Sequence, residues 1–168
     1  MGFALDAHSI SRLTGVHPDL VRVVQDCAAN GVMPFTFGIS QGLRTVAEQA
    51  KDVAAGKSKT MNSRHLDGHA VDLVVLVDNA ITWSWPSYDA LAEQMKLASV
   101  RTGVPIIWGG CWDKEIGLLG DDMEEEAASY VLRAKAAGGK GFLDGPHFEL
   151  PWGKYPSQPE AAEAPAVA

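Results

Sequence analysis

The sequence is poor in cysteine and has no cysteine motif. Its 168 residues include two cysteines, Cys27 and Cys111, which are far apart and not in CxxC spacing. Free cysteines are commonly buried, so we expect two ordinary thiols that form no disulfide framework. A chain of this length can bury a core without such staples, and reduced thiols fit a reducing compartment.

Basic residues are also scarce. The chain has 14 Lys and Arg against 21 Asp and Glu, which gives a formal net charge of −7. Sequence-independent binding to phosphate backbones needs clustered Lys and Arg, so nucleic acid is not an expected partner. The same charge would repel an anionic polymer, so any such substrate has to be recognised locally.

Long apolar runs are absent as well. Residues 1–13 lack a basic segment followed by an apolar one, so they do not resemble a secretory signal. No stretch approaches the ~18 apolar residues that span a bilayer. We therefore expect a protein made in the cytoplasm, with no transmembrane segment and, from its length, a single domain.

Apolar periodicity and turn residues predict a mixed series of helices and strands over residues 1–156. Helices are predicted at 9–13, 16–30, 45–55, 88–102 and about 121–137. Strands are predicted at 35–39, 70–77, 104–108 and 147–150. We expect an α+β fold, in which helices pack on one side of a small antiparallel sheet. Residues 157–168 are rich in Pro, Ala and Glu, and we predict a disordered tail there.

Two segments, 63–73 and 144–150, carry most of the chemistry. Asp72 lies inside an otherwise apolar strand of the first segment. An ionised carboxylate in such a strand is costly unless it is paired or binds a metal. One explanation is therefore a salt bridge from Asp72 to Arg44 or Arg64.

The other explanation is a metal. The histidines nearest to Asp72 in sequence are His65 and His69, and His147 lies on another apolar strand. Two neutral imidazoles and one carboxylate are a recognised ligand set for catalytic zinc, with a position left open for water. The residues alone support the metal and the salt bridge about equally.

Two motifs in these segments resemble the signatures of peptidase family M15, a family of zinc peptidases. Residues 63–72 match the pattern SxHxxGxAxD, and residues 144–147 match its second motif, an acidic residue three before a histidine. The family includes D-alanyl-D-alanine carboxypeptidases and dipeptidases, and the L-alanyl-D-glutamate peptidases of bacteriophage endolysins. The resemblance implies a fold like that of the D-alanyl-D-alanine peptidases.

The resemblance extends over about residues 8–152. Shorter matches to the family or to its phage-type members lie at 16–20, 42–45, 48–49, 56–58 and 108–110. One departure is the stretch between 112 and 142, which is longer than expected. We interpret residues 114–141 as an inserted helical segment within a catalytic domain that spans 1–156.

The resemblance implies a role for each matching residue. His65, Asp72 and His147 would ligate one zinc ion per chain. Asp144 would be the general base. Arg44 would orient the substrate or stabilise the oxyanion.

Four more residues are expected around these. Ser63, Gln49, Glu149 and Trp108 would support the ligands or contact the substrate. His69 is four residues from His65, as in HExxH, but no glutamate follows His65, so we do not expect His69 to be a ligand.

The resemblance also implies a substrate, the stem peptide of peptidoglycan. We expect cleavage of the L-alanyl-D-glutamate bond by a monomeric endolysin that reaches the cell wall after holin-type release. One alternative is a D-alanyl-D-alanine carboxypeptidase or dipeptidase with the same site. Another is a non-catalytic phage structural or binding module of the same fold.

Overall fold

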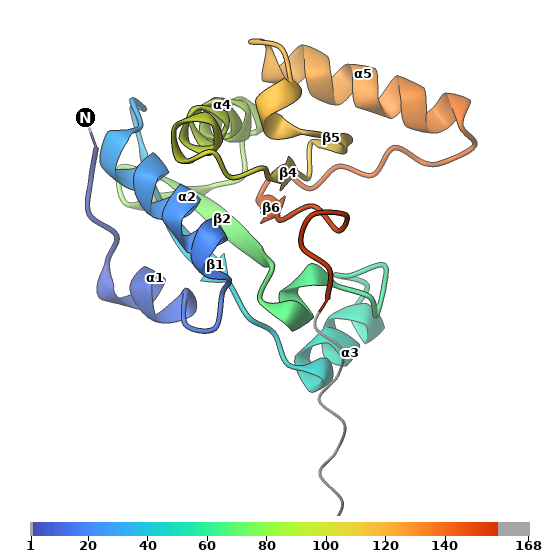
Figure 1. Cartoon of the computed structure of the whole chain (residues 1–168), viewed down its shortest axis with the longest axis horizontal. Helices are drawn as coiled ribbons and strands as arrows, with labels where there is room; N and C mark the ends of the chain where they lie inside the picture. Colours follow the sequence, from blue (N-terminus) through green and yellow to red (C-terminus); the bar gives the residue numbers. More distant parts are fainter. Residues whose placement is uncertain (1, 158–168) are drawn as a thin grey trace, which may run out of the picture.

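Antiparallel strands form one sheet through the middle of the molecule (Figure 1). The computed structural model describes residues 2–157, and within them the sheet has six strands. Their order is β1 (Thr36–Gln41), β2 (Ala70–Val77), β6 (His147–Glu149), β4 (Ile107–Trp108) and β5 (Cys111–Glu115), and β3 (Ala80–Thr82) also pairs with β2. This arrangement confirms the expected small antiparallel sheet.

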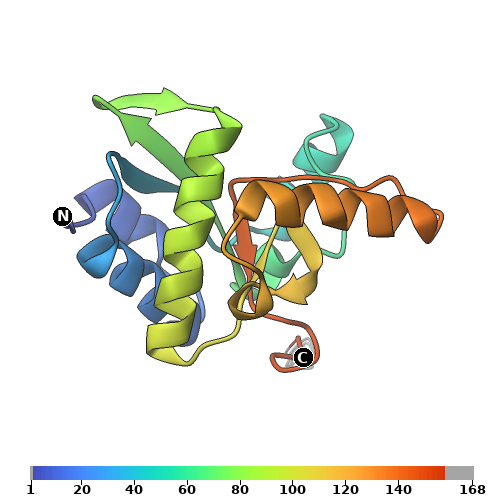
Figure 2. The ribbon, with the colours of Figure 1, turned by 90° about the horizontal axis from the view of Figure 1, so that it is seen from above.

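Helices cover one face of the sheet and border its ends (Figure 2). The two that pack against each other over the core are α2 (Pro18–Asn30) and α4 (Trp85–Thr102). The remaining helical elements are α1 (Ala7–Arg12), α3 (Val46–Ala54), η1 (Arg64–Asp67), η2 (Ile116–Leu118) and α5 (Met123–Ala136). The expected α+β fold is confirmed, and none of the helices in the described part of the chain is long and apolar enough to cross a membrane.

Strand β2 shows how the sheet separates core from site. Val71, Leu73 and Val75 are fully buried, and they pack in the same core as α2 and α4. Successive side chains of a strand point to opposite faces, so Asp72 points away from that core. The central strand is therefore apolar on its helix-covered face and carries its one carboxylate on the other.

Two short strands were not predicted. β3 follows a two-residue turn at Asp78 and Asn79, both with positive φ, and β5 follows Gly109 and Gly110. The strand predicted at 104–108 is reduced to β4, while the strand predicted at 70–77 is found unchanged as β2.

The predicted inserted segment contains η2 and α5. Asp122 caps the start of α5, because its side chain accepts a hydrogen bond from the backbone N–H of Glu125. Of the predicted tail, Ser157 is described and donates a hydrogen bond to Asp67, whereas residues 158–168 lie outside the described part of the chain.

Candidate metal centre

His65 is positioned by a tight turn before β2. Ser63 caps η1, since its hydroxyl oxygen accepts a hydrogen bond from the backbone N–H of His65. Gly68 ends η1 in the left-handed conformation at φ 68°, and a Cβ there would lie 2.1 Å from the carbonyl oxygen of Gly15. Only glycine fits this turn, which folds His65 back toward Asp72.

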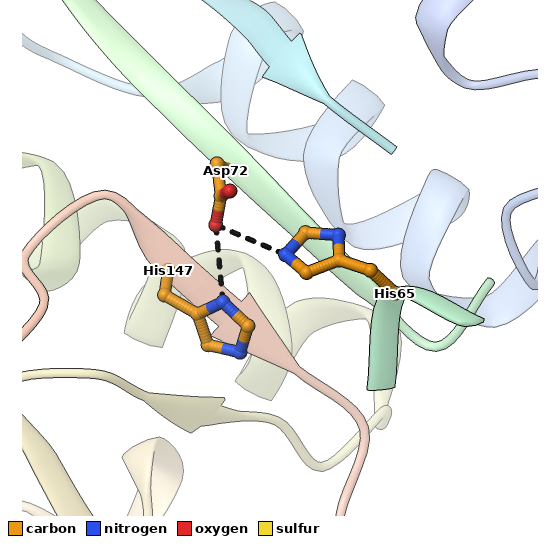
Figure 3. Close-up of side chains that lie close together, drawn as sticks. All are labelled: His65, Asp72 and His147. Carbon is orange, nitrogen blue, oxygen red and sulfur yellow. Dashed lines mark hydrogen bonds and ion pairs between the residues drawn. The ribbon is translucent and has the colours of Figure 1, made fainter. Parts of the chain in front are cut away.

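The structure brings together His65, Asp72 and His147 (Figure 3). Oδ1 of Asp72 lies 3.2 Å from Nε2 of His65 and 3.0 Å from Nδ1 of His147. Asp72 and His147 are direct partners across the β2–β6 pair, so the sheet register fixes this contact. One potential ligand atom from each residue lies within 4.8 Å of the others.

The second nitrogen of each imidazole is held from outside the cluster. Nδ1 of His65 lies 2.8 Å from the carbonyl oxygen of Gly42, and Nε2 of His147 lies 2.9 Å from Oε2 of Glu149. A histidine whose outer N–H is bound in this way turns its other nitrogen inward as a ligand. The donor set therefore fits a divalent metal such as zinc.

The electrostatics of the cluster also favour a cation. Burial would raise the pKa of Asp72, but the charge of His65 and hydrogen bonds from both imidazoles hold it well below its usual range. Burial would lower the pKa of His147, yet hydrogen bonds to Asp72 and Glu149 raise it to about 10. The carboxylates that favour a proton on His147 would equally favour a metal ion.

Arg44 lies beside the cluster, held by a network that includes Gln49. Its Nη2 is 3.6 Å from Oδ2 of Asp72, and its Nη1 is 3.4 Å from Asp52 and donates to Oε1 of Gln49 at 2.7 Å. Gln49 is fully buried and donates in turn to Ser58 at 2.8 Å. Asp52, which was not predicted, lies three residues after Gln49, a spacing that places both on one helix face.

Backbone hydrogen bonds hold Asp144 in the same cleft. Its backbone N–H donates to the carbonyl of Gly109 at 2.9 Å, and the N–H of Gly109 donates to the carbonyl of His147 at 2.8 Å. A Cβ on Gly109 would lie 2.1 Å from the carbonyl oxygen of Asp144, so the close approach requires glycine. Burial and the charge of Asp72 raise the pKa of Asp144, as is typical of a general base.

Trp108 was expected to support the ligands or contact the substrate, and it lies beneath the cleft rather than in its lining. Its side chain is fully buried, and its indole N–H donates to the carbonyl of Gly145 at 2.9 Å. This contact supports the turn between Asp144 and His147 from beneath. The nearby Trp112 faces the cleft instead, with its ring centroid 5.0 Å from that of His147.

Arg64 and His69 lie outside the cluster. Arg64 donates to the carbonyl oxygens of Leu150 and Tyr155, so of the two arginines considered for Asp72 only Arg44 approaches it. His69 is buried on the opposite side of the turn, where its ring lies 5.2 Å from that of His17.

A cleft of about 720 Å³ joins these groups. It is lined by the three clustered residues, by Asp144, Arg44, Ser63 and Glu149, and by aromatic side chains at its rim. Two imidazoles and a carboxylate in an open cleft are a donor set that catalytic metal sites use, and metal-dependent hydrolases are one class of enzyme with such sites.

Comparison with known proteins identifies the family. Residues 1–151 match the family described as phage L-alanyl-D-glutamate peptidase. The L-alanyl-D-glutamate peptidase of Escherichia phage T5 is 29% identical over 117 residues, which are 67% of this chain and 84% of that protein. The crystal structure of the Serratia marcescens L-Ala D-Glu endopeptidase ChiX is 35% identical, with a TM-score of 0.68 over 93% of this chain and 94% of the other. The chain belongs to the phage L-alanyl-D-glutamate peptidase family.

Proposed function

We propose that this protein is a zinc peptidase that cleaves the L-alanyl-D-glutamate bond of peptidoglycan stem peptides, as a phage-type endolysin. Membership of the family supports the reaction and the bond. The observation that carries the zinc assignment is the cluster of His65, Asp72 and His147, whose ligand atoms lie within 4.8 Å of one another.

Three residues would together hold one zinc ion per chain. His65 would bind through Nε2 and His147 through Nδ1, because their other nitrogens are engaged by Gly42 and Glu149. Asp72 would supply the negative charge. When bound, zinc supplies Lewis-acid activation of a carbonyl and of water.

Asp144 would move the proton. It lines the cleft, and its pKa is raised above that of an ordinary aspartate, toward neutral pH. It would accept a proton from the attacking water and return it to the leaving amine. The hydrogen bonds of Gly109 and the contact of Trp108 with Gly145 would keep this carboxylate in place.

Arg44 would stabilise the developing oxyanion or grip a substrate carboxylate. Gln49 and Asp52 would position its guanidinium, and Ser63 would fix the turn that carries His65. The ion pairs of Arg44 differ from those on a protein surface because the side chain of Arg44 is only 10% exposed.

The test is digestion of purified peptidoglycan followed by mass spectrometry of the released fragments. Cleavage at the proposed bond exposes a new amino-terminal D-glutamate and leaves L-alanine on the glycan side. A chelator should abolish this activity, and added zinc should restore it. Release of D-alanine instead would assign the protein as a D-alanyl-D-alanine peptidase, and no hydrolysis with zinc bound would indicate a structural or binding module.

We also propose that the enzyme acts as a monomer after holin-type release to the cell wall. Peptidoglycan is the partner that its family implies. Size-exclusion chromatography with light scattering tests the first point, and lysis by the cytoplasmic enzyme with and without a co-expressed holin tests the second.

A further inference from the structure

The cleft has two walls of different chemistry, one on each side of the metal centre. The wall on the α3 side carries Arg44, Lys57 and Lys59. The wall on the β5 and α5 side carries Trp112, Tyr130 and Phe142, which we name the aromatic wall. The two lie at opposite ends of the site because α3 follows the edge strand β1, whereas β5 forms the other edge of the sheet (Figure 1).

The aromatic wall begins next to a proposed zinc ligand. The ring of Trp112 lies 5.0 Å from that of His147, and it also stacks with Phe142 at a centroid distance of 6.2 Å and an interplanar angle of 29°. Phe142 remains 46% exposed. A large apolar ring left open at the rim of a polar cleft is available to a ligand.

The same wall is preformed. The indole N–H of Trp112 donates to the carbonyl oxygen of Phe142 at 3.0 Å, which ties β5 to the segment after α5. The preceding Gly141 has φ 65°, and a Cβ there would lie 3.0 Å from Cα of Val131 on α5. The backbone therefore approaches α5 closely just before Phe142. The segment 114–141 thus supplies Tyr130 and the support for Phe142.

We propose that the aromatic wall is a saccharide subsite that binds the N-acetylmuramyl group next to the L-alanine of the substrate. The inference rests on the proposed function, because the stem peptide is joined to muramic acid through a lactyl group. One alanine and one lactyl group span roughly 7 Å, at ~3.5 Å per residue. A saccharide on that side of the scissile bond therefore lies within reach of Trp112 and Phe142. Aromatic rings stack on the apolar faces of such sugars.

Charge fixes which way the substrate lies. The D-glutamate side carries the free carboxylates of the stem peptide, and these match the opposite wall, where Arg44, Lys57 and Lys59 outnumber the carboxylate of Asp52. The L-alanine side carries a neutral sugar, whose lactyl group is joined to the alanine by an amide. The orientation that pairs carboxylates with cations therefore directs the sugar to the aromatic wall.

The experiment compares two soluble substrates that differ only before the alanine. One is an N-acetylmuramyl-L-alanyl-γ-D-glutamyl peptide, and the other has an acetyl group in place of the muramyl group. We expect the wild-type enzyme to show a kcat/KM at least about tenfold higher for the muramyl substrate, mainly through a lower KM. Equal kcat/KM for the two substrates would overturn the subsite alone, and failure to cleave either at the alanyl–glutamate bond would overturn the proposed function together with it.

Variants locate the preference on the aromatic wall. Phe142→Ala should lower the ratio of the two kcat/KM values toward one. Trp112→Phe, which keeps a ring against His147, should lower it partly while zinc stays bound. The matched control is Leu132→Ala, which removes a side chain on α5 that is 68% exposed and does not line the cleft. If the ratio of the two kcat/KM values is unchanged in Phe142→Ala, or falls equally in Leu132→Ala, the aromatic rings do not bind the sugar.

Discussion

Each clustered imidazole has one nitrogen bound to the protein and one turned toward Asp72. Because of this division, the metal assignment can be tested residue by residue. We expect one tightly bound zinc per chain, lost in His65→Ala, Asp72→Ala and His147→Ala, since each change removes a proposed ligand. His69→Ala is the matched control and should keep its zinc.

Elemental analysis of the purified variants, after dialysis against a weak chelator, measures this. Full zinc occupancy in all three ligand variants would contradict the assignment. Loss of zinc from His69→Ala in a folded protein would mean that the wrong histidine was chosen.

Glu149 is buried and Asp144 is partly buried, and the two carboxylates lie on different sides of His147. Glu149 binds the outer nitrogen of His147, whereas Asp144 faces the cleft. Asp144→Asn should therefore stay folded and keep zinc while losing activity by about 10²–10⁴-fold, as expected for a general base. Steady-state kinetics on a muramyl peptide, with Glu149→Gln measured in parallel, check this. Near-normal activity in Asp144→Asn with an inactive, zinc-loaded Glu149→Gln would reverse the two roles.

Arg44 distinguishes a structural ion pair from a contact with the reacting groups. Arg44→Lys keeps the charge beside Asp72 and Asp52 but loses the planar fork that also reaches Gln49. We expect unchanged zinc content and a fall of at least about tenfold in kcat/KM, equivalent to ~1.4 kcal/mol. Kinetics and melting curves of the variant measure both. Wild-type kinetics in a well-folded variant would remove Arg44 from the reaction.

The side chains that form the site were easier to predict than the backbone groups that hydrogen-bond to them. The motif at residues 63–72 predicted that His65 and Asp72 act together, and the structure brings both to His147. The carbonyl of Gly42 on His65, by contrast, could not be predicted, because every residue has a carbonyl and only the tertiary fold selects one. The choice between the two roles offered for Trp108 stayed open for a related reason, since sequence position alone does not tell which face of the β4–β5 hairpin a tryptophan occupies.

At the level of elements, the long periodic segments were predictable and the short strands were not. The pattern of residues 70–77 is apolar enough to identify β2 by itself. β5 reads Cys-Trp-Asp-Lys-Glu, and its polar character concealed it, although Gly109 and Gly110 before it are a hairpin signal. Asp78 and Asn79 are a similar signal for β3, since both residue types tolerate positive φ. Turn chemistry would have found both strands.

Helix α4 carries an unfavourable carboxylate where it meets the start of α5. Burial, with the charges of Glu124 and Asp122, raises the pKa of Asp89 from 3.8 to about 6, and among the described residues its Oδ1 has no hydrogen-bond partner. The folded protein therefore holds this proton more tightly than the unfolded chain. Stability contributed by the protonated form is lost as the pH rises through about 4 to 6.

Asp89→Asn should consequently stabilise the protein above pH 6 and have little effect near pH 4. After discounting for solvent screening at this partly exposed side chain, the gain should be about 1 kcal/mol, or roughly 2–4 °C in Tm. Thermal melts at the two pH values test it, with each wild-type melt as the control. An equal shift at both would mean that the effect is not one of ionisation.

At the scale of the whole molecule, residues 151–157, which we name the C-terminal strap, contact residues from the first half of the chain. Arg64 is only 2% exposed, and its guanidinium donates to the carbonyl oxygens of Leu150 and Tyr155 and lies 4.3 Å from the ring of Trp152. Tyr155 donates its hydroxyl hydrogen to Asp19 in the first turn of α2. The strap thus links the first helices to the residue that precedes His65. The family match ends at residue 151, so most of this link lies beyond it.

Two truncations separate the strap from the rest of the C-terminus. Removing residues 158–168 keeps every contact described for the strap, and stability should stay within about 0.5 kcal/mol of the full chain. Removing residues 152–168 takes away the acceptor at Tyr155 and the ring of Trp152, and leaves a buried guanidinium short of partners. An unsatisfied buried charged group costs about 1–3 kcal/mol or more, and at roughly 2–4 °C per kcal/mol for a chain of this length the Tm should fall by roughly 2–12 °C. Because Arg64 precedes His65, zinc should also bind more weakly, and competition with a chelator measures this. Equal melting temperatures and equal zinc affinity in the two truncated proteins would show that the strap supports neither the fold nor the site.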